Sequence, residues 1–183
     1  MPYVAALTKA WDELIKLSPS SHTAVALLND TYEIDLKNKS IISNSSGAPT
    51  KDYLTILLLH YLIGHFKNNY SPGGEWVSLR EVEGGESYYP VFHNSVIEPV
   101  LRKYGETPEN LWKVLEHLGG RRIQEGDIAI ELVTFADVLV RIILWKADAE
   151  FGPEATILFD RNLKKVYSME DIVVFLHFII SRL

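Results

Sequence analysis

The sequence contains no cysteine among its 183 residues. This absence excludes disulfide bonds, zinc sites built on thiolates, cysteine nucleophiles and cysteine-held iron–sulfur clusters. A metal ion bound by this chain alone must therefore take its ligands from His, Asp, Glu or Tyr side chains or from backbone oxygens.

Long apolar runs and clusters of basic residues are also missing. The most apolar stretch, residues 54–66, is shorter than the about 20 residues that span a bilayer. The N-terminus shows no signal-peptide pattern, because Lys9, Asp12 and Glu13 interrupt its apolar positions. The formal charge is -6 and the basic residues are scattered, whereas phosphate backbones attract clustered Lys and Arg. We therefore expect a cytoplasmic protein that binds neither nucleic acid nor membranes.

Standard catalytic signatures are absent as well. The sequence has no glycine-rich phosphate-binding loop, no nucleophile elbow and no paired-histidine metalloprotease motif. Its Gly-Gly pairs do not stand between a strand and a helix, as phosphate-binding glycines do, so we expect turns and helix ends there. Whether the chain is an enzyme is left open.

The residues that are present indicate an ordinary globular protein. Hydrophobic residues make up 47% of the chain and charged residues 23%, which supports a core without a metal or disulfide. A length of 183 residues fits one domain, and no domain boundary is evident. We therefore predict a single globular domain over 1–183.

Hydrophobic periodicity predicts helices mainly in the first two thirds of the chain and strands in the last third. The predicted helices are 3–17, a strongly apolar helix capped by Thr50, 92–104, a helix beginning at Thr107, and a final helix opened by a capping box of Ser168 and Asp171. The predicted strands are 32–36 and 39–43, paired across a turn, and then 128–132, 138–144 and 155–159. This order indicates an α+β fold with an antiparallel sheet, mostly in the C-terminal third, packed against several helices.

Two histidines, His60 and His65, lie on the strongly apolar helix. Five residues at about 100° each place them about 140° apart around the helix, so they cannot share one metal ion. One of them could act alone as an axial ligand to a tetrapyrrole or corrinoid. The alternative is a core histidine that is hydrogen-bonded to the backbone.

Aromatic rings, arginine and histidine are combined in the segments 75–81 and 88–93. Rings stack on flat ligands while an arginine binds a carboxylate or phosphate, so this mixture suits a pocket for a large planar or anionic molecule. Arg80, Tyr89 and His93 are the candidate ligand-binding residues. The alternative is an aromatic loop that packs on itself and pairs its own charges.

Carboxylates are concentrated near the ends of two predicted strands. Asp148 and Glu150 follow one strand and Asp160 ends the next, so they could converge if these strands pair. Converging carboxylates hold a divalent cation or act as an acid–base pair, although the spacing here is not that of a calcium loop. The alternative is that they form turn hydrogen bonds or pair with Arg141 or Lys146.

Arg141 interrupts an otherwise apolar strand. Either this face of the strand is exposed to solvent, or Arg141 is buried against a carboxylate.

The C-terminal segment also carries a family resemblance. The pattern W-x-x-D-x-E-F at 145–151, then ILFD at 157–160 and ED at 170–171, resembles the signature of an uncharacterised family of anaerobic bacteria and archaea, known as a domain of unknown function. LHYL at 59–62, GEW at 74–76, RE at 80–81 and LGG at 118–120 are similar to that family's pattern too. The resemblance covers most of the chain.

The resemblance implies a chemical setting. Longer members of that family resemble fusions of this domain with a cysteine-rich four-iron cluster module, similar to the one in corrinoid iron–sulfur proteins of one-carbon metabolism. This implies corrinoid, tetrapyrrole or redox-cofactor chemistry, without assigning catalytic residues. The present chain lacks that module and has no cysteine, so a partner protein must supply any cluster that it works with.

Three functions are therefore expected, in descending order. The first is a binding or accessory protein for a corrinoid or haem-like cofactor, with His60, His65 or His93 as the axial ligand and Arg80 and Tyr89 at the ligand's edge. The second is an interaction module that docks an iron–sulfur or methyl-transfer partner, helped by its acidic surface. The third is an enzyme that uses the carboxylates of the two strand ends, with or without a divalent ion.

Overall fold

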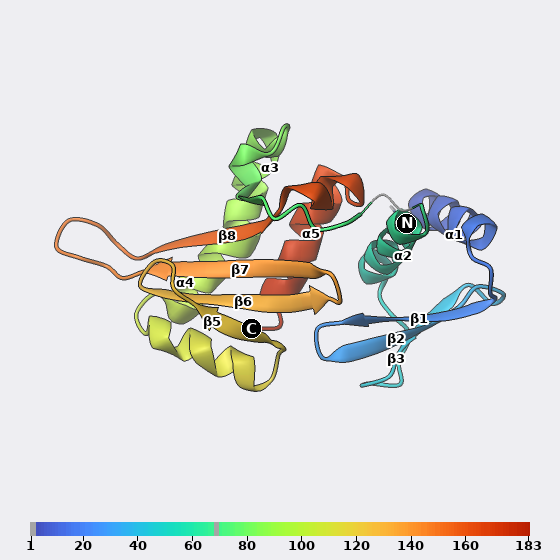
Figure 1. The fold of residues 1–183 in the computed structure, drawn as a ribbon, viewed down its shortest axis with the longest axis horizontal. Coiled ribbons are helices and arrows are strands. Elements are labelled where there is room, and N and C mark those ends of the chain that lie inside the picture. The colour runs from blue at the N-terminus through green and yellow to red at the C-terminus, as the bar shows by residue number, and fades with distance from the viewer. Residues whose placement is uncertain (1–2, 68–69) are drawn as a thin grey trace.

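The computed structural model describes residues 3–67 and 70–183 and shows an α+β fold with two antiparallel sheets. The N-terminal part consists of α1 (Val4–Leu17), β1 (His22–Leu27), β2 (Asp30–Asp35), β3 (Ser40–Ser43) and the long helix α2 (Asp52–Phe66). The three strands form a small sheet in the order β1-β2-β3, and α1 packs against α2 beside it (Figure 1).

The second half of the chain forms the larger sheet. Its strands are β4 (Trp76–Val77), β5 (Gly120–Ile123), β6 (Ile128–Phe135), β7 (Val138–Trp145) and β8 (Glu154–Asp160). They lie in the order β4-β8-β7-β6-β5, and each pair of neighbours is antiparallel. The predicted α+β class with an antiparallel sheet in the C-terminal half is therefore confirmed.

Several helical segments of this half pack against the larger sheet, and others pack on those segments. They are η1 (Leu79–Glu81), α3 (Gly85–Phe92), the π-helical η2 (His93–Ile97), α4 (Glu98–Tyr104), η3 (Pro108–Glu116), η4 (Arg161–Lys165) and α5 (Met169–Ile180). Figure 1 shows α4 and α5 crossing behind the strands, while the opposite face of the sheet is turned toward the viewer.

The core lies between this sheet and the helices. Alternate residues of β7 point inward, so that Val140 and Ile142 are fully buried, and Phe175 of α5 is fully buried too. Burying such a side chain contributes about 1.5–3 kcal/mol relative to leaving it in water. The period of two that predicts strands in this region therefore also selects the residues that hold the sheet to its helices.

Helix α2 is buried on nearly all sides, as its sequence predicts. It begins one residue later than expected, because Lys51 rather than Thr50 stands at the cap position and no side chain caps the helix. The Thr50 hydroxyl instead lies 2.6 Å from the hydroxyl of Thr55. Within 3–67 and 70–183, neither α2 nor any other helix combines the length and the apolar character needed to cross a membrane.

The predicted helix 92–104 is longer and less regular than expected. It starts at Gly85 and runs through α3, η2 and α4, with the π-helical turn in the middle. Pro99 has no N–H to donate to the carbonyl of Ser95, four residues earlier, which disfavours a regular α-helical turn here. The Ser95 oxygen instead lies 2.9 Å from Nδ1 of His177 on α5, so the irregular turn is used to attach a neighbouring helix.

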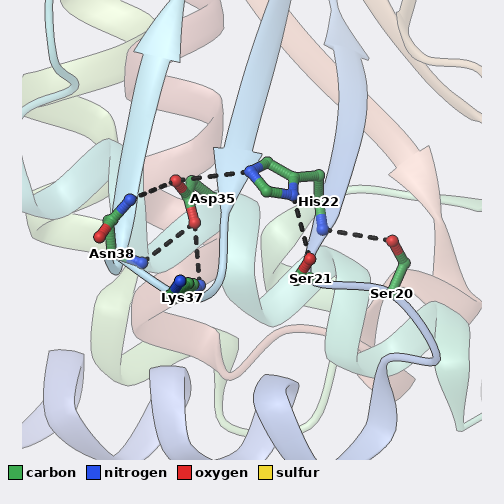
Figure 2. Close-up of polar contacts among 6 residues, drawn as sticks. All are labelled: Ser20, Ser21, His22, Asp35, Lys37 and Asn38. Atoms are coloured by element: carbon green, nitrogen blue, oxygen red, sulfur yellow. Dashed lines mark hydrogen bonds and ion pairs between the residues drawn. The ribbon is translucent and has the colours of Figure 1, made fainter.

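The turn between β2 and β3 is tied to the start of β1 by Asp35, as Figure 2 shows. The Asp35 carboxylate accepts hydrogen bonds from the backbone N–H groups of Lys37 and Asn38 and from the Asn38 side chain. It also lies 3.5 Å from Nε2 of His22. The predicted pairing of 32–36 with 39–43 is thus confirmed. The contact with His22 also attaches the turn to β1.

Candidate functional site

A cavity of about 260 Å3 lies where α1, α2 and the start of α5 meet, and we call it the His60 cavity. Tyr53, Ile56 and His60 line it from one face of α2, because residues three and four apart share a helix face. Its full lining is Tyr3, Ala6, Tyr53, Ile56, Leu57, His60, Ser168, Glu170, Asp171 and Val174. Most of the wall is apolar, with a small number of polar groups, which is the usual composition of a ligand pocket.

His60 is held in this cavity by a carboxylate from another helix. Its Nδ1 lies 3.1 Å from Oδ2 of Asp171, which accepts hydrogen bonds from the hydroxyl and the backbone N–H of Ser168 as well. The same Asp171 therefore completes the predicted capping box of α5 and orients an imidazole on α2. The side chain of Asp171 is 15% exposed and that of His60 is 32% exposed.

The charge of Asp171 decides which nitrogen of His60 carries the proton. Burial alone would raise the pKa of Asp171, but the hydrogen bonds from His60 and Ser168 outweigh it and hold the pKa below its usual value. An ionised carboxylate only accepts hydrogen bonds, so the proton of a neutral His60 sits on Nδ1. Nε2 then keeps its lone pair, and it has no hydrogen-bond partner among the described residues.

His65, five residues further along α2, lies in a different environment. Its Nδ1 is 3.8 Å from Oδ2 of Asp137, and its side chain is 58% exposed. Asp137 instead accepts a 2.6 Å hydrogen bond from the hydroxyl of Tyr61, whose ring stacks on Phe135. Burial and the neighbouring Asp137 raise the pKa of Tyr61, so its hydroxyl stays a donor. This cluster attaches the β6–β7 turn to α2.

Arg80, Tyr89 and His93 lie together on the surface of η1, α3 and η2. The guanidinium carbon of Arg80 is 3.5 Å from the centre of the Tyr89 ring, and that ring is 5.9 Å from the ring of His93. Glu86 lies 3.6 Å from Arg80, and Glu98 lies 3.7 Å from His93. The three predicted residues are neighbours, but each charge is paired within the chain, as the alternative interpretation expects.

The carboxylates Asp148, Glu150 and Asp160 are not brought together. Strands β7 and β8 pair antiparallel, which places Asp148 and Glu150 in the connecting loop and Asp160 at the far end of β8. Asp148 accepts hydrogen bonds from the backbone N–H groups of Glu150 and Phe151, both 2.8 Å long. In the described part of the chain, no group of three or more His, Asp or Glu side chains is arranged to hold a metal ion.

Asp160 has its own local partners. Its carboxylate accepts hydrogen bonds from the backbone N–H groups of Gly73, Gly74 and Asn162, at 2.7–2.8 Å. It is 7% exposed and so fastens the segment before β4 to the end of β8. The turn hydrogen bonds given as the alternative for these carboxylates are therefore present.

Arg141 is only 18% exposed and is paired with a carboxylate, which favours the second of the two alternatives for this residue. Its Nε lies 2.9 Å from Oε2 of Glu131, the residue opposite it on β6. Arg121 on β5 binds the other oxygen of Glu131, also at 2.9 Å. The guanidinium of Arg141 stacks on Trp76, 3.9 Å from the ring centre, and also pairs with Glu125. This network spans the larger sheet from β5 to β4.

A serine, a histidine and an aspartate also meet at the edge of the small sheet (Figure 2). Ser21 Oγ lies 3.1 Å from Nδ1 of His22, and Nε2 of His22 is 3.5 Å from Asp35. A catalytic triad needs a buried carboxylate that fixes the imidazole, whereas the His22 side chain is 68% exposed and Asp35 already binds the β2–β3 turn. These contacts tie two loops together.

Sequence reasoning did not predict that Asp171 is the hydrogen-bond partner of His60. The two residues are 111 positions apart, so no local pattern joins them. The capping box placed Asp171 in the first turn of the last helix but gave no information on which element that turn contacts. The packing of α2 against α5 supplies this information.

Comparisons with known proteins give one result. The family model described as a domain of unknown function (DUF3786) matches residues 14–182. Neither the curated proteins nor the solved structures contain a match. Since the matched region covers nearly all of the sequence, the chain belongs to the DUF3786 family.

Proposed function

We propose that this protein binds a metal-centred corrinoid or tetrapyrrole, with His60 as the axial ligand. One observation carries the proposal: Nδ1 of His60 is bound by the carboxylate of Asp171, which leaves Nε2 as a free electron-pair donor in a mostly apolar cavity. Histidines that bind metals usually donate their other N–H to a carboxylate or carbonyl, which fixes the ring and raises its basicity.

The other two candidate histidines lack this combination. His65 is more than half exposed, and the carboxylate next to it is engaged by Tyr61. His93 lies 3.7 Å from Glu98 on the helix surface, outside the lining of the His60 cavity. His60 is thus the histidine of the three whose surroundings match those of a metal ligand.

The size of the cavity adds a constraint on the complex. Its volume of about 260 Å3 is smaller than the about 300–1,000 Å3 of pockets that enclose a drug-sized ligand. The apolar side chains of Ala6, Ile56 and Val174 can contact only part of a macrocycle, and the rest of the ring would extend beyond the cavity. This favours an accessory role, in which a partner protein covers the exposed part of the cofactor.

The family setting agrees with such a role. The resemblance described above implies work beside corrinoid or iron–sulfur proteins of anaerobes. Because the chain has no cysteine, a cluster in such a complex would belong to the partner. The metal of the bound cofactor would supply the redox or methyl-transfer chemistry. This chain would supply His60 as the axial ligand and fix which of its nitrogens carries the proton.

An absorption titration tests the proposal. Purified protein is titrated separately with hydroxocobalamin and with haem, and we expect a saturable band shift with at least one of them. His60→Ala should abolish the shift, whereas the matched variants His65→Ala and His93→Ala should retain it. Asp171→Asn should bind about 10–100-fold more weakly, as is usual when the partner of a metal-binding histidine is lost. A flat titration with both cofactors, or a shift that survives His60→Ala, would contradict the proposal.

A further inference from the structure

A second cleft lies on the other side of Tyr53, between the small sheet, the β3–α2 loop and the end of α5. It consists of two adjoining cavities of about 330 and 200 Å3. Asp30, Tyr32, Ser45 and Arg182 line both cavities, so they form the boundary that the cavities share. None of these four residues takes part in the His60 cavity.

Arg182 supplies a positive charge to this cleft. Its guanidinium carbon lies 4.9 Å from the centre of the Phe178 ring, one turn earlier, which fixes the direction of the long side chain. No carboxylate of the described residues forms an ion pair with it, whereas every other arginine named so far, at positions 80, 121 and 141, has an acidic partner. A planar guanidinium in this situation is suited to bind a carboxylate with two parallel hydrogen bonds.

Asp30 supplies a negative charge at the same boundary. Its carboxylate accepts hydrogen bonds from the hydroxyl of Ser43 at 2.6 Å and from the hydroxyl and backbone N–H of Ser45 at 2.7 and 3.0 Å. These three donors hold the carboxylate in one orientation. Burial works against its charge, but the hydrogen bonds prevail and lower the pKa of Asp30. Together with burial, this charge raises the pKa of Tyr32 to about 12, so the phenol stays protonated.

Asp30 and Arg182 share the boundary of the cleft without forming an ion pair with each other, and Lys51 adds a second positive charge to the larger cavity. Opposite charges that both line an open space attract a ligand that also carries both signs, with its own charges in the reverse order. A dianion such as phosphate could pair with Arg182 and Lys51, but at the shared boundary it would also meet the Asp30 carboxylate, which repels it. A molecule with a carboxylate and an ammonium group would satisfy both walls.

We infer that this cleft binds a small zwitterion of the α-amino-acid class. Its carboxylate pairs with Arg182 and its ammonium group with Asp30. The remainder of the ligand then lies in the larger cavity, beside Tyr53 and Leu54. This inference does not depend on cofactor binding at His60, because Arg182 and Asp30, which bind the two charged groups, do not line the His60 cavity.

Binding is measured by isothermal calorimetry and thermal shift on the full chain, with each of the twenty amino acids as probe. We expect at least one amino acid to bind saturably. Its 2-hydroxy acid, which lacks the ammonium group, and its decarboxylated amine should each bind at least tenfold more weakly. Inorganic phosphate should not compete. These comparisons between ligands test the contributions of the ammonium group and of the carboxylate without altering the protein.

Two variants test the protein side. Arg182→Gln should weaken amino-acid binding at least tenfold, while the matched variant Arg102→Gln, at an exposed position of α4 outside the cleft, should bind as the unchanged protein does. The absence of saturable binding by any amino acid would overturn the inference. Equal binding of the 2-hydroxy acid, or competition by phosphate, would overturn it too, because the site would then recognise an anion alone.

Discussion

Helix α2 carries His60 near its middle and His65 near its C-terminal end, and each lies next to an aspartate, yet the two pairs differ in what the aspartate does. In the first pair, Asp171 binds His60 at 3.1 Å and shares its charge with the cap of α5. In the second pair, Asp137 is bound by Tyr61 at 2.6 Å and lies 3.8 Å from His65. The first pair borders a cavity, and the second lies at the surface beside a tight turn.

The difference teaches that a histidine–carboxylate pair alone does not define a site. At His65 the Tyr61 hydroxyl is the closer donor to the carboxylate, and the imidazole makes only a longer contact with it and is 58% exposed. At His60 the other donors come from the helix cap, which leaves the imidazole as the side chain that the carboxylate orients. The predictions that follow test whether the carboxylate beside His60 serves a binding site and the one beside His65 only structure.

The largest effect is expected from Asp171→Ala. It removes two hydrogen bonds to Ser168 and one to His60 from a carboxylate that is 15% exposed, so the free energy of unfolding should fall by about 2–3 kcal/mol. Urea denaturation followed by circular dichroism measures this loss. Glu170→Ala, at an exposed position in the same helical turn, is the matched control and should change stability by less than about 0.5 kcal/mol. Equal losses in both variants would show that the loss does not come from the capping and histidine bonds.

A smaller effect is expected at the pair of His65 and Asp137, from Tyr61→Phe. The variant keeps the ring that stacks on Phe135 but leaves Asp137 without its closest donor, which should cost about 1–2 kcal/mol. His65→Ala is the matched control, and its long contact and high exposure predict a change within about 0.5 kcal/mol. Neither variant should alter ligand binding at His60. A larger loss from His65→Ala than from Tyr61→Phe would reverse the comparison.

Local patterns predicted most of the fold, for identifiable reasons. Alternation along the first half of β7 and the hairpin of β2 and β3 report directly on which side chains face the core. The capping box of α5 is a contact within four residues, so its geometry follows from the sequence. The π-helical turn of η2 was not predicted, because it depends on Pro99 together with a carbonyl contact to α5. A pattern within one helix contains no information about a neighbouring helix.

The candidate sites were harder to predict for the same reason. The spacing of His60 and His65 correctly excludes a shared ion, since that is a property of one helix. The partners of both histidines come from residues 72 and more positions away, where only the packing of whole elements decides. The carboxylates Asp148 and Asp160 were wrongly predicted to converge. Strands β7 and β8 do pair, but their antiparallel pairing places Asp160 far from Asp148.

The smallest effect is confined to acid pH and concerns only the ionisation of Asp171. Its pKa lies below the usual 3.8 in the folded protein, so the unfolded chain binds more protons as the pH falls through this range. The stabilisation is complete above about pH 5 and is lost as the pH falls through the folded pKa. The difference in unfolding free energy between the unchanged protein and Asp171→Asn should therefore be constant near pH 5 and shrink toward pH 2.5. Asp137→Asn, beside His65, serves as the comparison, because this prediction depends only on the pKa of Asp171. A difference for Asp171→Asn that grows with falling pH would mean that burial, and not the bonds to His60 and Ser168, dominates at this carboxylate.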